Sequence, residues 1–218
     1  MARRLAVLSD FDGTITTTDI AEMVLARFAA PEWEAIEQLH RARRIGTRET
    51  MARQFALVRG DRKALLEFVQ AEARMDPGFP AFLRTCQASG IHFEIVSEGL
   101  DFYVDELMKM WGLDVPVRTN RAVFDNAGVR IEYPFEDATC TLCGTCKLAR
   151  LFELRTSGFQ VAYVGDGDSD LCPAVEADRV YAKDRLADLC DAEQIPYRRF
   201  RDFTDIAREV AAWRAQTS

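Results

Sequence analysis

The chain alternates between short apolar runs and longer segments in which apolar residues recur with helical spacing. The short runs cover residues 5–8, 91–96, 161–164 and 179–182. Each leads into polar or glycine-containing sequence, which predicts buried parallel strands that end in loops. A further alternation over residues 115–133, centred on Asp125-Asn126-Ala127-Gly128, predicts a β-hairpin beside the core.

Helical spacing dominates from residue 16 to residue 75. The apolar positions that recur in this way are Ile20, Met23, Val24, Phe28, Met51, Phe55 and Val58. Asp61 stands where it would cap a further helix that carries Leu65, Leu66 and Val69. This segment is predicted to be a small helical bundle that ends at Asp76-Pro77-Gly78.

Two more helices are predicted outside this bundle. One carries Phe79 and Phe82 and closes at Gly90, a residue type favoured in a left-handed C-terminal cap, and the other covers residues 144–156. Strands that alternate with helices indicate an α/β fold with a Rossmann-like parallel sheet flanked by helices. We therefore expect residues 1–15 and 76–218 to form the α/β core, and residues 16–75 to form an inserted small helical cap.

The size and charge of the chain limit the number of domains and the kinds of partner that are expected. Its 218 residues are 48% hydrophobic and 29% charged, which is enough for a full core and a small accessory module. The formal net charge of −7 opposes broad attraction to nucleic acid or anionic lipid, so neither is expected as a partner. The only basic cluster, at Arg41, Arg43 and Arg44, is expected to be a solvated helix face.

No segment of the sequence has the pattern of a membrane span or a secretory signal. No apolar stretch approaches the roughly 20 residues that a bilayer requires. The N-terminus is basic, but the apolar run that follows is broken by Ser9 and Asp10. A cytoplasmic protein is therefore expected, and the sequence leaves open whether it is a monomer or a homodimer.

Two aspartates stand at the end of the first predicted strand. Asp10 and Asp12 are two residues apart, so both side chains can point to one side while Phe11 points into the core. Gly13 allows a sharp backbone turn, and Thr14 offers a hydroxyl and an amide to an anion. Taken alone, Asp-x-Asp-Gly is also common in turns and calcium loops, so an incidental turn stays open.

More carboxylates are expected at the same edge of the sheet. Asp166 and Asp170 follow the third strand, and the carboxyl ends of parallel strands lie together. Several like charges in a small volume need a cation, and an oxygen-only cluster with few protein ligands suits Mg²⁺. We expect Asp10, the backbone carbonyl of Asp12 and Asp166 to bind the metal, with Asp170 orienting the site.

These motifs resemble, in their order along the chain, the four motifs of the haloacid dehalogenase superfamily. They are SDFDGT at residues 9–14, IVSEG at 95–99, Lys147, and GDGDSD at 165–170. Four ordered motifs at strand ends are far more specific than any one of them. The match spans almost the whole chain and implies a phosphohydrolase.

The resemblance also implies a role for each motif residue. Asp10 would be the nucleophile that forms an aspartyl phosphate, and Asp12 the general acid and base. Ser97, Gly99 and Lys147, together with Gly13 and Thr14, would bind the phosphate or the substrate. Asp166 and Asp170 would form the magnesium loop.

The inserted helices resemble the small cap of phosphoserine phosphatase relatives, which implies a small phosphorylated metabolite as substrate. Asp19 occupies the place where those enzymes have a substrate-binding Glu. It could contact a substrate or only cap the helix that follows, and the sequence leaves both open. Glu98 departs from the small residue usual beside the motif-two serine, and we expect it to add negative charge near the entrance.

Three local segments resemble the 2-hydroxy-3-keto-5-methylthiopentenyl-1-phosphate phosphatases of methionine salvage. They are Pro31-Glu32-Trp33-Glu34, Ser97-x-Gly-x-Asp101-Phe102-Tyr103 and Cys143-Gly144-x-Cys146-Lys147. That substrate is therefore a candidate, and phosphoserine or another small phosphate ester is an alternative. Phosphomutase chemistry would also use Asp10 and Asp12.

A different class of function rests on the cysteines. Three of them follow two-residue spacing, which is a common zinc signature, at Cys140, Cys143 and Cys146. No fourth ligand is evident, although Cys172 could lie close, and His40 and His92 stand in ordinary helix and strand contexts. A structural metal site, a redox module and simple buried thiols all stay open at this point.

Overall fold

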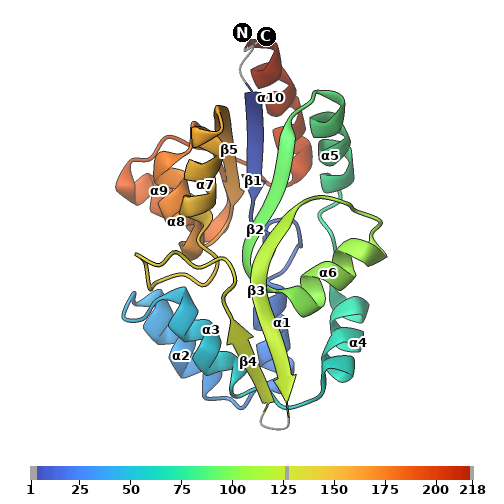
Figure 1. Ribbon diagram of the computed structural model, residues 1–218, viewed down its shortest axis with the longest axis vertical. Coiled ribbons are helices and arrows are strands. Elements are labelled where there is room, and N and C mark those ends of the chain that lie inside the picture. The colour runs from blue at the N-terminus through green and yellow to red at the C-terminus, as the bar shows by residue number, and fades with distance from the viewer. Residues whose placement is uncertain (1–3, 126–127, 217–218) are drawn as a thin grey trace.

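The computed structural model describes residues 4–125 and 128–216 (Figure 1). Its strands are β1 (Arg4–Ser9), β2 (His92–Leu100), β3 (Val117–Asp125), β4 (Gly128–Glu132), β5 (Phe159–Gly165), β6 (Arg179–Ala182) and β7 (Arg198–Arg199). Its helices are α1 (Ile20–Phe28), α2 (Trp33–Arg41), α3 (Thr47–Phe55), α4 (Arg62–Glu72), α5 (Phe79–Ala88), α6 (Asp101–Met110), α7 (Lys147–Thr156), α8 (Leu171–Glu176), α9 (Asp184–Glu193) and α10 (Phe203–Gln216), with a 3₁₀ turn at Asp168–Asp170. None of the helices in this part of the chain is long and apolar enough to cross a membrane.

The strands form one twisted sheet in the order β4-β3-β2-β1-β5-β6-β7. All neighbouring strands are parallel except β4, which runs antiparallel to β3. The predicted α/β fold with a parallel sheet is therefore confirmed. The predicted hairpin extends this sheet, and Figure 1 shows it running alongside helix α3. Its expected turn residues Asn126 and Ala127 lie outside the described residues.

Both faces of the sheet are buried, as the continuous apolar run in β1 predicts. Leu5 and Val7 belong to the larger core cluster, which also contains residues of α5, α6 and α10. Ala6 and Leu8 point to the opposite face and pack with residues of α7. The alternation places helices on both sides of the sheet and leaves polar residues at the carboxyl ends of its strands.

The helices α1 to α4 come between β1 and α5 in the chain and lie at the carboxyl end of the sheet (Figure 1). An antiparallel bridge between Thr16 and Met75 closes this segment at its base. Its buried residues Val24, Phe55 and Val69 join the larger core cluster. We propose that residues 16–75 form a helical cap on an α/β core made of residues 1–15 and 76–218.

Three details of the secondary structure differ from the prediction. Strand β2 continues through residues 97–100 with a register irregularity after Val96, so the motif-two residues lie within the strand. Helix α7 begins at Lys147, later than predicted, because Glu98 holds the backbone amides of Gly144 and Thr145 outside the helix. Helices α6, α8, α9 and α10 and the short strand β7 were not predicted.

Candidate active site

Asp10 lies at the point where β1 ends. Its backbone N–H donates to the carbonyl of Val164 on β5 at 2.9 Å, which ties it to the neighbouring strand. Its Oδ1 accepts from the backbone N–H of Phe11 at 2.7 Å, and its Oδ2 accepts from Lys147 Nζ at 2.7 Å. Both carboxylate oxygens of Asp10 are therefore held in place.

Lys147 is the first residue of α7, and its side chain is only 2% exposed. Its ammonium donates to Asp10 at 2.7 Å, to Asp170 Oδ1 at 2.6 Å and to Ser169 Oγ at 2.9 Å. Burial alone would lower the pKa of Lys147, but the charges of Asp10 and Asp170 raise it. The group is a permanent buried cation beside Asp10, as the sequence order of the motifs suggested.

Asp10, Asp166 and Asp170 form the acidic cluster expected from the strand ends. One carboxylate oxygen of each lies within 4.8 Å of one from the others. The Thr14 hydroxyl donates to Asp166. Asp170 Oδ2 accepts from the backbone N–H groups of Asp166 and Gly167, each at 2.9 Å, so Asp170 shapes the loop that carries Asp166.

The electrostatics of this cluster fit a bound cation. Burial raises the pKa of Asp10 to about 7, with repulsion from Asp170 adding to the effect and Lys147 opposing it. Burial and the charges of Asp170 and Asp10 also raise the pKa of Asp166 well above its usual range. One ammonium does not balance three carboxylates, and Mg²⁺ prefers a few carboxylate oxygens of this kind. The residues present therefore fit the metal that the sequence predicts.

The side chain of Asp12 turns away from this cluster. Its Oδ2 accepts from the hydroxyl of Tyr103 at 2.6 Å, and its Oδ1 accepts from the backbone N–H of Ile20 at 3.3 Å. Burial, with the charge of Asp19 as the next cause, raises the pKa of Asp12 well above its usual range. A carboxyl group with a raised pKa can carry a proton at neutral pH, as a general acid must.

Two glycines give the aspartates the room they need. Gly13 has a φ of +70° and lies so close to the Asp166 carboxylate that a side chain could not fit. Gly99 lies over Asp12, where a Cβ atom would be 2.5 Å from Oδ2. Ser97 is buried beside it, and its Oγ accepts from the Gly99 N–H at 3.0 Å. The motif glycines are therefore required by close packing at the site.

A cavity of about 630 Å³ lies between the core and the cap helices. The core side of its lining includes Asp10, Asp12, Ser97, Gly99 and Asp166. The cap side includes Asp19, Leu25, Trp33, Glu37, Met51 and Gln54. Within the described chain, the remaining predicted residues lie behind this lining and contact it, namely Gly13, Thr14, Lys147 and Asp170.

Asp19 caps a helix, as one interpretation of the sequence held, and it also lines the cavity. Its Oδ1 accepts from the Glu22 N–H at 2.8 Å, so it is the N-cap of α1. The geometry by itself therefore allows Asp19 to cap the helix and to contact a substrate.

Two residues of the cap lie in a different environment from the one that the sequence predicts. His40 and Arg41 line the cavity, whereas the sequence pattern suggested packed or solvated positions for them. Both are tied to Glu37, because Arg41 Nε donates to it at 2.9 Å and His40 Nδ1 lies 4.0 Å from it. The interactions with His40 and Arg41 outweigh burial and lower the pKa of Glu37 to about 2. The cap therefore presents an ionised Glu37, paired with Arg41, to the cavity.

The sequence suggested that Glu98 adds negative charge near the entrance of the site. In the structure, Glu98 has a further role as a hydrogen-bond acceptor. Although it borders the cavity, its carboxylate accepts from Asn120 Nδ2 at 3.0 Å and from the backbone N–H groups of Gly144 and Thr145 at 3.1 and 3.2 Å. The Thr145 hydroxyl in turn donates to Asn120 Oδ1 at 3.0 Å. Glu98 thus anchors the segment that leads into Lys147.

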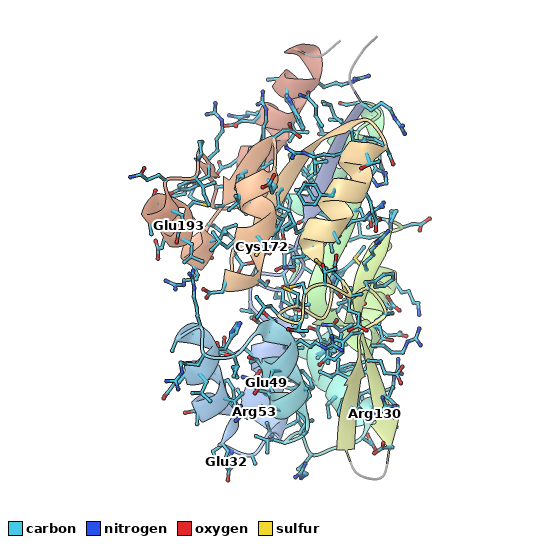
Figure 2. The ribbon with its side chains drawn as sticks, turned by 60° about the vertical axis from the view of Figure 1, so that its left-hand side comes forward. Glu32, Glu49, Arg53, Arg130, Cys172 and Glu193 are labelled. Carbon is cyan, nitrogen blue, oxygen red and sulfur yellow. The ribbon has the colours of Figure 1, made fainter. Side chains whose placement is uncertain are left out.

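The cysteines do not form a preassembled metal site. Among the residues that the structure describes, Asp10, Asp166 and Asp170 are the only group of three or more potential ligands with donor atoms within 4.8 Å of one another. Cys172 is exposed on α8 of the core, and Figure 2 shows it above the cap helix α3 that carries Glu49 and Arg53. Burial raises the pKa of Cys143, which keeps its thiol protonated.

Sequence reasoning missed three polar contacts of the site. Tyr103 was noted only as part of a local similarity, and Tyr163 was counted as part of an apolar strand, although its hydroxyl donates to Asp170 Oδ1 at 2.5 Å. Ser169 accepts from Lys147. The one available signal was the amphipathic nature of tyrosine, because a buried tyrosine hydroxyl usually finds a partner.

Comparison with known proteins gives consistent results. The family described as Putative Phosphatase matches residues 5–193. The chain is 34% identical over 214 residues to a 2-hydroxy-3-keto-5-methylthiopentenyl-1-phosphate phosphatase of Brevibacillus brevis, covering 95% of this chain and 96% of the relative. It is 35% identical over 212 residues to a protein of the same name from Geobacillus kaustophilus, covering 94% and 95%.

Solved structures support the fold. A substrate-bound phosphoserine phosphatase superposes with a TM-score of 0.74 at 18% identity and covers 96% of this chain and 99% of that one. A phospho-aspartyl intermediate analogue of phosphoserine phosphatase gives a TM-score of 0.73 at 19% identity, covering 95% and 99%. At these identities the likeness establishes the shared architecture.

Proposed function

Because the chain belongs to the Putative Phosphatase family of the haloacid dehalogenase superfamily, and is therefore a phosphatase, we propose that it hydrolyses a small phosphate monoester through an aspartyl phosphate on Asp10. The observation that carries this mechanism is the convergence of Asp10 and Asp166 in the cavity lining, with Lys147 directly behind them and bonded to Asp10. That arrangement supplies a nucleophile, a cation and a metal-binding carboxylate at one point.

In the first step, an oxygen of Asp10 attacks phosphorus, and the bond from phosphorus to the leaving oxygen breaks. Asp12 gives its proton to that oxygen, so the leaving group departs as a neutral alcohol. Lys147 compensates negative charge on the transferred group, and Ser97 orients it. Covalent catalysis divides one difficult displacement into two easier ones.

In the second step, water attacks the phosphorus of the aspartyl phosphate. Asp12, now deprotonated, takes a proton from this water, and the bond from phosphorus to Asp10 breaks. Inorganic phosphate leaves and both aspartates return to their starting states.

The superfamily is generally magnesium-dependent, and we propose that this chain is too. Asp10, the backbone carbonyl of Asp12 and Asp166 would bind the ion, with Asp170 orienting them. Bound Mg²⁺ would neutralise negative charge on the phosphoryl group.

The proposed substrate is 2-hydroxy-3-keto-5-methylthiopentenyl-1-phosphate, after the names of relatives that align over nearly their full length. The cap side of the cavity supports this choice. Leu25, Trp33 and Met51 offer an apolar wall for an uncharged chain, while Glu37 and Gln54 offer polar contacts for hydroxyl and keto oxygens. Phosphoserine would instead place two charged groups, a carboxylate and an ammonium, against this partly apolar wall.

A phosphate-release screen tests the proposal. The purified protein is assayed with this substrate, with phosphoserine and with p-nitrophenyl phosphate, each with and without Mg²⁺. We expect magnesium-dependent release and the highest kcat/KM for the methylthiopentenyl ester. Higher kcat/KM for phosphoserine would contradict the substrate, and no release from any ester would contradict the function.

A further inference from the structure

Tyr103 is a buried tyrosine whose hydroxyl reaches the proposed acid and base group. It lies in the first turn of α6, is fully buried, and donates to Asp12 Oδ2 at 2.6 Å. Tyr103 is not one of the described residues that line the cavity. An influence of Tyr103 on the reaction must therefore pass through Asp12.

The orientation of the Asp12 carboxyl group depends on few contacts. Rotation about the last bond of an aspartate side chain is broad, so hydrogen-bond partners must select its orientation. The contact with Tyr103 is the shorter of the two, since the Ile20 N–H lies 3.3 Å from Oδ1. Tyr103 is thus the main restraint on this carboxyl group.

Strand β2 leaves space for this hydrogen bond. A Cβ atom on Gly99 would lie 2.5 Å from Asp12 Oδ2 and 2.7 Å from the Tyr103 hydroxyl. A side chain at position 99 would clash with the Asp12 carboxyl group and with the Tyr103 hydroxyl. The glycine of motif two and the tyrosine of α6 therefore belong to one arrangement around Asp12.

We propose that Tyr103 is a positioning residue that occupies one carboxyl oxygen of Asp12, so that the other oxygen faces the leaving group. This inference rests on the proposed function. In the step it affects, the proton moves from Asp12 Oδ1 to the leaving oxygen, which keeps the electron pair of the broken bond, while Tyr103 keeps its own proton. A correctly aimed general acid contributes about 10²- to 10⁴-fold, and misalignment forfeits part of this factor.

Comparison of two esters in a Tyr103→Phe variant tests the inference. An alkyl phosphate needs a proton on its leaving oxygen, whereas p-nitrophenolate leaves without one. We expect kcat/KM to fall about tenfold for the alkyl ester and less than about twofold for p-nitrophenyl phosphate. The ratio of the two values does not depend on the folded fraction of the sample. Tyr103→Leu, which removes the same hydroxyl with different packing, should shift the ratio in the same direction.

Two controls show whether Tyr103 acts through Asp12. Tyr181 is buried on β6 and does not line the cavity, so Tyr181→Phe should leave the ratio unchanged. In an Asp12→Asn background, Tyr103→Phe should cause no further loss with the alkyl ester, because residues that act as a unit are not additive.

An unchanged ester ratio in Tyr103→Phe, or a further loss in the Asp12→Asn background, would overturn the inference alone, provided that the wild-type protein hydrolyses both esters. If the wild-type protein hydrolysed neither of the two esters, that result would overturn the proposed function and the inference with it.

Discussion

At the scale of single residues, Asp19 combines a structural contact with a place in the cavity lining. It accepts from the Glu22 N–H, and a helix cap of this kind is worth about 1 kcal/mol. The same carboxylate borders the space above Asp12. Substitutions that separate its capping capacity from its charge can therefore assign its role.

We predict that Asp19→Asn and Asp19→Ala both change KM or the ranking of substrates, while the dependence on Mg²⁺ stays the same. Asparagine caps a helix as well as aspartate does, so only Asp19→Ala should lower the free energy of unfolding, by about 1 kcal/mol. Steady-state kinetics and urea unfolding of the two variants measure these effects. Unchanged kcat/KM for every substrate in both variants would mean that Asp19 is only a helix cap.

Single residues also show how far the sequence could predict the site. The strand-end positions of Asp10, Asp166 and Asp170 follow from the topology of a parallel sheet, so their proximity was predictable. The contact of Tyr103 with Asp12 was not, because the two residues are 91 positions apart and meet only through the packing of α6. Sequence periodicity carries no information about such a contact.

At the scale of elements, the entry into α7 depends on Glu98. This strand residue accepts from the backbone of Gly144 and Thr145, shortly before Lys147. The sequence placed the helix start at Gly144 because helical periodicity cannot reveal that a distant carboxylate holds these amides. The position of the buried lysine is thus coupled to strand β2.

We predict that Glu98→Gln lowers the free energy of unfolding by about 1–3 kcal/mol, because buried backbone N–H groups lose their charged acceptor. The same change should displace Lys147 and weaken inhibition by inorganic phosphate. Urea unfolding and the inhibition constant of phosphate measure the two effects. Glu132→Gln on β4 is the matched control, and equal behaviour of the two variants would refute the anchoring role.

A second contact joins strand β2 of the sheet to helix α7. Glu94 on β2 is 2% exposed and pairs with Arg150 of α7 at 2.7 Å and with Arg118 of β3 at 3.2 Å. Burial alone would raise the pKa of Glu94, but the hydrogen bonds from His92 and Arg150 and the charges of Arg150 and Arg118 lower it. The folded state therefore favours the ionised carboxylate.

We predict that the contribution of Glu94 to the free energy of unfolding is lost on acidification. Because the folded pKa lies below the ordinary value of 4.5, the contribution of Glu94 is present above pH 4.5 and is lost as pH falls through the folded pKa. Glu94→Gln should therefore destabilise the protein at neutral pH and lose less stability on acidification than the wild type. Urea unfolding across this range checks it, and parallel curves for the two proteins would contradict it.

At the scale of the whole molecule, the proposed cap and core both contribute residues to the lining of the cavity. The residues proposed for the chemistry come from the core, while the apolar wall and Glu37 come from the cap. The parallel sheet, the helical character of residues 16–75 and the hairpin were predictable because each follows from hydrophobic periodicity. The direction of the cap side chains was not, since His40 and Arg41 were expected outside the cavity that they line.

We predict that activity requires Mg²⁺, disappears with a chelator and returns when Mg²⁺ is restored, because three carboxylates with one ammonium need a further cation. Elemental analysis of the purified protein distinguishes this from the cysteine alternative. Stoichiometric zinc that is present in the wild type and lost in Cys143→Ser would favour a cysteine site. Zinc that survives in Cys143→Ser would exclude Cys143 as a required ligand.

The central claim is that Asp10 forms a covalent bond to phosphorus, and the most direct measurement is to locate that phosphoryl group. The enzyme is mixed with p-nitrophenyl phosphate and Mg²⁺, quenched in acid during turnover, and analysed by peptide mass spectrometry. We predict a phosphorylated Asp10 in the wild type, and neither phosphorylation nor turnover in Asp10→Asn. Turnover of Asp10→Asn at a rate comparable to the wild type, or a phosphoryl group trapped on another residue, would contradict the account.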